Sequence, residues 1–157
     1  MIQLNGLFTR DSIVVDLDAE DRDAATAELV HKLVDAGRLS ADAAVDVLAA
    51  LTEREKQGST GFGKGVAVPH AKHAVVPEMM GAIGVSKAGI DFNSLDAKPV
   101  RTIVLLLSPA DRSREHLDAM QTVFKVLQQD LLRRDLAEAT SVDAVLHVLR
   151  QADGVPA

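Results

Sequence analysis

The residues best suited to chemistry lie in one stretch, residues 58–73, which reads GSTGFGKGVAVPHAKH. Four glycines fall within its first eight residues, namely Gly58, Gly61, Gly63 and Gly65. Glycine allows close approach to the backbone, and bare backbone amides bind anions. Pro69 fixes its own φ and favours an extended Val68, so His70 follows a stiff support. We therefore expect phosphoryl chemistry on His70, with a phosphate-binding loop formed by Gly61, Gly63 and Gly65.

Phosphoryl transfer asks a protein mainly for a positioned nucleophile and for groups that stabilise charge. Neutral imidazole is a nucleophile near neutral pH, because its unperturbed pKa is about 6.5. One ring nitrogen must face the phosphorus while the other holds the proton. Arg54, at the end of a predicted helix just before the loop, offers a planar fork that matches phosphate oxygens. His116, in the first turn of a later predicted helix, can donate a hydrogen bond beside free helix amides.

A nucleotide site is one alternative for this loop. Residues 58–64, GSTGFGK, match the GxxxxGK core of a nucleotide-binding loop. Gly65 replaces the Ser or Thr that would hold Mg²⁺, and a predicted helix rather than a strand precedes the motif. Both differences argue against the nucleotide interpretation.

A metal site built from His70, His73 and His116 is a second alternative. No Asp or Glu lies between Lys64 and Pro77 to complete such a site, and the lysines of the loop would repel a cation. We therefore expect no metal and no cofactor. A third alternative assigns no chemistry at all: His70 ends a strand, and His116 is a partly buried helix residue.

The composition is that of an ordinary soluble globular protein, with 47% hydrophobic and 25% charged residues. A length of 157 residues predicts a single domain over residues 1–157. The absence of cysteine excludes a disulfide framework. A net charge of −6, no basic run and only four aromatic residues argue against nucleic-acid binding. No apolar run approaches the roughly 20 residues of a membrane span, and no signal pattern opens the chain, so we expect a cytoplasmic protein without membrane insertion.

Hydrophobic periodicity and capping residues predict the elements that position these side chains. Helices are predicted over residues 19–36, 40–57, 111–127 and 130–139 and from Ser141 onward, and strands over residues 13–15, 80–86 and 100–107. Ser40 and Ser141 are expected N-caps, either Asp111 or Ser113 is expected to cap the fourth helix, and Gly37 is expected to end the first.

The connections between these elements follow from the same patterns. Residues 89–92 suggest a hairpin return, and the segment after His70 is expected to be a loop or turn. Residues 100–107, VRTIVLLL, show no alternation, as in a strand buried on both faces. His31 and His147 fall on polar helix faces and are expected to be solvated. The predicted fold is an α/β sandwich, a mixed β-sheet flanked by helices on both faces.

Residues 58–72 also resemble the signature of enzyme IIA domains of the bacterial phosphotransferase system, in the fructose, mannitol and nitrogen-regulatory class. The resemblance extends upstream over residues 51–55, LTERE, and resumes at residues 108–110 and 115–117, so it covers nearly the whole chain. It implies that His70 takes the phosphoryl group, that His116 contacts the phosphate, and that Arg54 helps to hold the loop and the phosphate. It assigns His73 no role.

The resemblance further implies a stand-alone phosphocarrier, a phosphotransferase component without a cofactor. Its donor would be the histidine phosphocarrier protein, and its acceptor in sugar uptake would be a IIB domain. The alternative is a purely regulatory interaction module of the nitrogen-regulatory type, which has no sugar substrate and whose phosphorylation state controls binding to a target protein.

Overall fold

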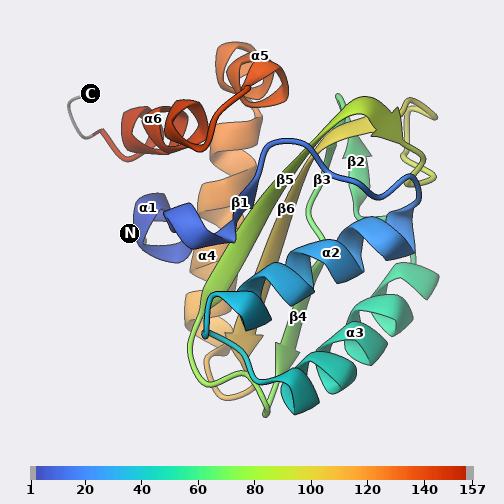
Figure 1. Ribbon diagram of the computed structural model, residues 1–157, viewed down its shortest axis with the longest axis vertical. Helices are drawn as coiled ribbons and strands as arrows, with labels where there is room; N and C mark the ends of the chain where they lie inside the picture. Colours follow the sequence, from blue (N-terminus) through green and yellow to red (C-terminus); the bar gives the residue numbers. More distant parts are fainter. Residues whose placement is uncertain (1–2, 155–157) are drawn as a thin grey trace.

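A mixed sheet carries helices on both faces in the computed structural model, which describes residues 3–154 (Figure 1). The strands follow the order β1-β5-β6-β3-β2, and β4 also pairs with β6. Their bounds are Ile13–Val14 for β1, Gly61–Gly63 for β2, Val66–Ala67 for β3, His70–His73 for β4, Met80–Ile90 for β5 and Val100–Pro109 for β6. The predicted α/β sandwich is confirmed.

Strand β6 lies at the centre of the sheet and explains the unbroken apolar run of residues 100–107. It pairs antiparallel with β5 along one edge and parallel with β3 and then β4 along the other. Leu105 and Leu107 pack in the cluster beneath one helical layer, while Val104 and Leu106 pack in the cluster beneath the other. Both faces of β6 are therefore buried, as predicted.

One face of the sheet is covered by α2, Arg22–Asp35, and α3, Ala41–Lys56 (Figure 1). Ser40 caps α3 as predicted, since its hydroxyl oxygen accepts a hydrogen bond from the Ala43 amide at 3.1 Å. Gly37 follows α2 with a φ of 75°, the left-handed conformation that a C-terminal glycine provides. Helix α3 ends directly before Gln57 and Gly58, so it delivers its last turn to the glycine-rich stretch.

The other face is covered by α4, Ser113–Leu127, with α5, Asp130–Glu138, α6, Val142–Ala152, and the short N-terminal α1, Leu4–Leu7. A 3₁₀ turn, Arg10–Ser12, leads from α1 into β1. Ser141 caps α6 as predicted. The expected cap of α4 is wrong, because Arg112 occupies the N-cap position and makes no capping side-chain bond. Ser113 is already inside the helix, and its hydroxyl accepts a hydrogen bond from Lys72.

Strand β5 is longer than predicted, and the expected hairpin return at residues 89–92 is wrong. The strand continues to Ile90 through a register shift after Val85, and Gly89 there has a φ of 85°. The chain reverses in the connection over residues 91–99 instead. A bulge of this kind inserts unpaired residues without ending the strand.

Residues 70–73 form strand β4 and not the expected loop. They pair in parallel with residues 106–109 of β6, with His70 opposite Leu106. The Leu106 amide also donates to the Pro69 carbonyl at 3.0 Å, so pairing continues past the proline. The strand arises because the edge of β6 beyond β3 offers unpaired backbone groups, which a local sequence pattern does not reveal.

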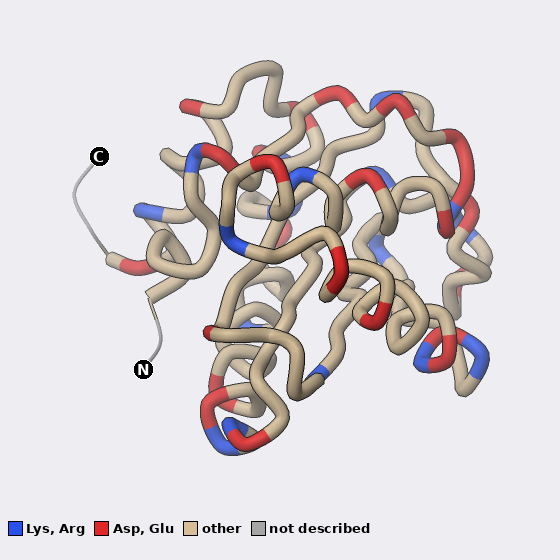
Figure 2. The backbone as a smooth tube through the Cα atoms, turned by 60° about the horizontal axis from the view of Figure 1, so that its bottom comes forward, with Lys and Arg blue, Asp and Glu red and all other residues tan. Residues whose placement is uncertain are grey.

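The structure also shows how the charged residues are distributed and whether any helix could span a membrane. Figure 2 shows acidic and basic residues interspersed along the helices and loops. Among residues 3–154, no helix combines the length and the apolar character needed to cross a bilayer.

Candidate functional site

His70 is the first residue of β4, opposite Leu106 of β6. Side chains alternate between the two faces along an extended segment. Val68 packs in the cluster beneath α4, whereas Ala67 and Ala71 pack beneath α2 and α3. His70 shares the face of Val68, and its side chain is half-buried. The imidazole is therefore held by a strand, faces α4 and remains reachable from solvent.

The backbone determines which nitrogen of His70 is available. His70 Nδ1 lies 2.7 Å from the Val68 carbonyl oxygen, and because a carbonyl only accepts, Nδ1 carries the proton and donates it. Burial lowers the pKa of His70 below 6.5; the Val68 hydrogen bond and the charge of Glu55 oppose this shift, and the charge of Arg54 adds to it. The ring is thus neutral near pH 7, with the lone pair of Nε2 available as a nucleophile.

His116 from α4 stands beside this ring, with 5.7 Å between the ring centroids and 43° between the ring planes. Its side chain is buried, and its Nδ1 lies 2.7 Å from the hydroxyl oxygen of Ser108 on β6. Burial lowers the pKa of His116 from 6.5 to about 4, with further contributions from the charges of His70 and Lys72. A neutral imidazole therefore lies beside the His70 ring, and the structure brings together the two histidines that the sequence singles out.

Arg54 lies in the last turn of α3 and holds the chain that leads to the site. Its Nη1 donates to the Gly58 carbonyl at 2.8 Å, and its positive charge contributes to the lowered pKa of His70. The guanidinium therefore holds the start of the 58–60 segment, and its charge acts on the imidazole of His70. The sequence-based expectation that Arg54 approaches the His70 site agrees with this placement.

Glu55 is a site residue that the sequence reasoning did not identify. Its side chain is only 6% exposed and accepts hydrogen bonds from the amide and the hydroxyl of Thr60, with Arg22 Nη1 at 3.9 Å. The carboxylate therefore ties residues 58–60 to the end of α3. One signal was available, because a carboxylate in the last turn of a helix opposes the helix dipole and needs a local partner.

The structure does not bring Gly63 and Gly65 to His70, so the expected phosphate-binding loop requires correction. The Gly65 carbonyl accepts from the amides of Arg101 and Thr102, whereas His70 lies farther along β6, opposite Leu106. Four residues of strand separate Thr102 from Leu106, or about 13 Å.

One amide of this turn, that of Lys64, is also already engaged. The Lys64 amide donates to the Asp96 carboxylate at 2.9 Å, which places a protein carboxylate where an anion was expected. A Cβ at Gly61 would lie 2.3 Å from the Ser94 hydroxyl. These glycines are therefore explained by a tight turn and by close packing against residues 91–99.

His73 does not join His70, because three residues along a strand place the two side chains on opposite faces. Its Nδ1 accepts from the Val75 amide at 3.1 Å in the turn after β4. No group of three His, Asp or Glu side chains within residues 3–154 is arranged to hold a metal ion. Helix α3 leads into the GxxxxGK motif, and nucleotide-binding loops follow a strand instead. His31 and His147 are exposed, as predicted.

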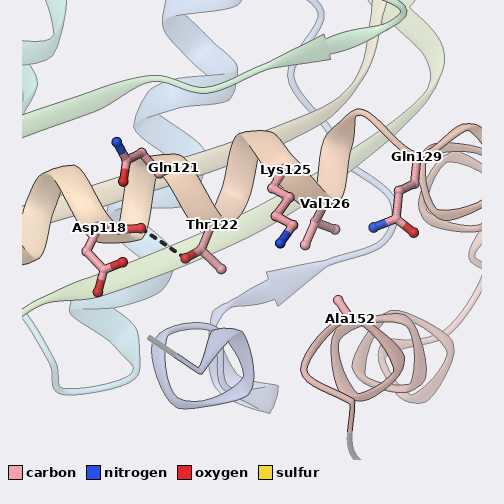
Figure 3. A pocket seen from close by; sticks show the side chains of 7 residues that line it. All are labelled: Asp118, Gln121, Thr122, Lys125, Val126, Gln129 and Ala152. Atoms are coloured by element: carbon pink, nitrogen blue, oxygen red, sulfur yellow. Dashed lines mark hydrogen bonds between the residues drawn. The ribbon is translucent and has the colours of Figure 1, made fainter. Parts of the chain in front are cut away.

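A surface hollow of about 380 Å³ lies along the second half of α4 and reaches the end of α6 (Figure 3). Its charged residues are Asp118 and Lys125, and the Thr122 hydroxyl donates to the Asp118 carbonyl at 2.9 Å. Neither His70 nor His116 lines it. The hollow is therefore separate from the histidine pair.

Comparisons with known proteins find similar sequences and structures over nearly the whole chain. The family model described as phosphoenolpyruvate-dependent sugar phosphotransferase system, EIIA 2, matches residues 6–152. The chain is 32% identical over 152 residues to the fructose-specific EIIABC component of Bacillus subtilis, covering 97% of this chain and 24% of that protein. It is 37% identical over 131 residues to the fructose-specific EIIA component of Haloferax volcanii, covering 83% of each. The crystal structure of nitrogen regulatory protein IIA-Ntr from Neisseria meningitidis superposes with a TM-score of 0.84 at 31% identity, covering 93% of this chain and 98% of that one.

Proposed function

We propose that this chain accepts a phosphoryl group on Nε2 of His70 and passes it on. The chain belongs to the EIIA 2 family of the phosphoenolpyruvate-dependent sugar phosphotransferase system, and the proposal starts from that membership. The observation that carries this assignment is the hydrogen bond from Nδ1 to the Val68 carbonyl, which leaves Nε2 with a free lone pair. The half-buried position of the ring supports the proposal, because the nucleophile must be aimed and yet remain open to a donor.

The transfer needs no net movement of a proton. The N–P bond of the donor phosphohistidine breaks as a bond forms between His70 Nε2 and phosphorus, and the electron pair of the broken bond returns to the donor nitrogen. The His70 ring becomes positively charged and keeps its Nδ1 proton, for which the Val68 carbonyl is the acceptor. When the phosphoryl group leaves again, the neutral ring is restored with the same proton on Nδ1.

Two neighbouring side chains fit the role of stabilising the transferring group. Arg54 adds a positive charge near His70 and can bind phosphate oxygens with its planar fork. His116 is neutral and can donate one hydrogen bond from Nε2. Phosphoryl transfer depends mostly on such positioning and on charge stabilisation, which is the chemistry that this arrangement supports.

The proposed donor is the histidine phosphocarrier protein, and the proposed acceptor in sugar uptake is a IIB domain. Leu117 supports docking of a protein partner, because its side chain is 58% exposed directly after His116. We propose that this phosphoryl transfer takes place in the cytoplasm. We also propose that residues 1–157 form one domain. The shared sheet of the described residues supports the single domain.

A regulatory module is the second candidate function. The observation that favours it is the likeness to a nitrogen regulatory protein, with a TM-score of 0.84 at 31% identity. This chain spans about a quarter of the fructose-specific EIIABC component and 83% of a separate fructose-specific EIIA component. The two functions differ in the fate of the phosphoryl group. Transfer of label from the phosphorylated protein to a IIB domain would support sugar uptake. A label that stays on the protein and changes its binding to a target protein would support regulation.

The test of the phosphocarrier function is labelling of the purified chain. The histidine phosphocarrier protein is phosphorylated with radioactive phosphate beforehand, separated from its own donor and mixed with wild type, His70→Ala or His73→Ala. We expect label on wild type and on His73→Ala but none on His70→Ala. Label retained by His70→Ala would move the phosphorylation site elsewhere.

A further inference from the structure

Ser108 lies near the end of β6 with its hydroxyl against His116. It follows Leu106 by two residues and so shares the face that packs beneath α4. Its side chain is fully buried, and its Oγ lies 2.7 Å from His116 Nδ1. His116 is 8% exposed, so this hydrogen bond is shielded from solvent at both ends.

The donor and acceptor atoms of Ser108 and His116 determine the direction of this hydrogen bond. A hydroxyl has one proton to donate, and neutral imidazole has one N–H and one bare nitrogen. Among the described residues, His116 Nδ1 is the acceptor within reach of the Ser108 hydroxyl. If His116 donated instead, the buried hydroxyl proton would have no acceptor, which is costly. Ser108 therefore donates to Nδ1.

The direction matters because His116 is neutral near pH 7, as its pKa of about 4 requires. A neutral ring carries its proton on only one nitrogen. With Nδ1 accepting from Ser108, the proton resides on Nε2, which then acts as a donor. In the other tautomer Nε2 would present a lone pair to phosphate oxygens and repel them.

We propose that Ser108 is a positioning residue for phosphoryl transfer, whose buried hydroxyl keeps the His116 proton on Nε2 for donation to a phosphoryl group on His70. This inference rests on the proposed function, because it gives His116 its donor role. Ser108 acts through His116 and does not itself touch the transferring group.

The first test is the rate of phosphoryl transfer from the phosphorylated histidine phosphocarrier protein. Ser108→Ala should slow transfer by roughly threefold to tenfold, the rate equivalent of one lost neutral hydrogen bond. Ser108→Thr keeps the hydroxyl and should restore most of the rate. Ser86→Ala is the matched control, since Ser86 is a buried strand serine whose hydroxyl accepts from the Gly89 amide, and it should transfer at the wild-type rate.

The second test separates positioning from simple damage to the fold. Nitrogen-15 NMR of the imidazoles should show His116 protonated on Nε2 in wild type and a mixture of tautomers in Ser108→Ala. In a His116→Ala background, Ser108→Ala should slow transfer no further. An Nδ1-protonated His116 in wild type, or a full additional loss in the double variant, would overturn the inference. If His116→Ala itself transfers phosphate at the wild-type rate, His116 does not stabilise the transferring group, and that part of the proposed function is wrong.

Discussion

Acid should destabilise this protein through His116, whose pKa is lowered from 6.5 to about 4 by burial and by the charges of His70 and Lys72 on β4. Between these two values the unfolded chain binds a proton that the folded protein does not bind. Stability is therefore retained above pH 6.5 and lost as the pH falls toward 4. For a single group with this shift, the free energy of unfolding should fall by about 2 kcal/mol between pH 7 and pH 5.

Urea denaturation at pH 7 and pH 5 measures this loss. His116→Gln removes the titrating ring but keeps a polar group, so its free energy of unfolding should fall about 2 kcal/mol less than that of wild type over the same interval. Other groups titrate in both proteins and largely cancel in the comparison. His147→Gln removes an exposed ring from α6 and serves as the matched His→Gln substitution away from the site. Equal pH dependence in wild type and His116→Gln would refute the lowered pKa of His116.

Three further predictions concern transfer, cofactors and packing. Arg54→Ala and His116→Ala should keep the fold and slow transfer in a rapid-quench assay by about tenfold to a hundredfold, because a hydrogen bond to a charged group contributes about 1.5–3 kcal/mol; wild-type rates would remove these residues from the site. The phosphorylated donor protein should label the chain even with a chelator present, whereas ATP with Mg²⁺ should not; stoichiometric zinc or labelling by ATP would contradict this. Gly81→Ala should lower the free energy of unfolding by about 1–3 kcal/mol, because its Cβ would lie 2.2 Å from the Phe8 ring and 2.9 Å from the Leu105 carbonyl oxygen; an unchanged melting temperature would contradict the close packing.

Much of the helical framework could be predicted because its signals are local. Ser40 and Ser141 cap helices as expected, and Gly37 adopts the left-handed conformation expected after α2. Strand β4 could not be predicted, because residues 70–73 become a strand only by pairing with β6, more than thirty residues later in the chain. Tertiary pairing decides such short segments, and their local pattern does not reveal it.

The sequence predicts which residue types form the candidate site better than it predicts their hydrogen bonds and packing. The structure brings together His70 and His116, which the sequence singles out. The carbonyl that fixes the His70 tautomer, that of Val68, is placed by the backbone just before β4, which the residue types alone do not reveal. Glycine serves both close packing and anion binding, so the sequence alone predicts an anion-binding loop at Gly61 and its neighbours. Only the position of residues 91–99 distinguishes the two roles, and no local signal marks it.

The central claim is that phosphorus becomes bonded to Nε2 of His70, and NMR of the phosphorylated protein tests it most directly. The chain is labelled with nitrogen-15, phosphorylated by the histidine phosphocarrier protein, and examined for coupling between phosphorus-31 and each imidazole nitrogen. The geometry predicts coupling to His70 Nε2, with the Nδ1 proton still present and directed at the Val68 carbonyl. Coupling to His70 Nδ1, or to either nitrogen of His73 or His116, would contradict the account.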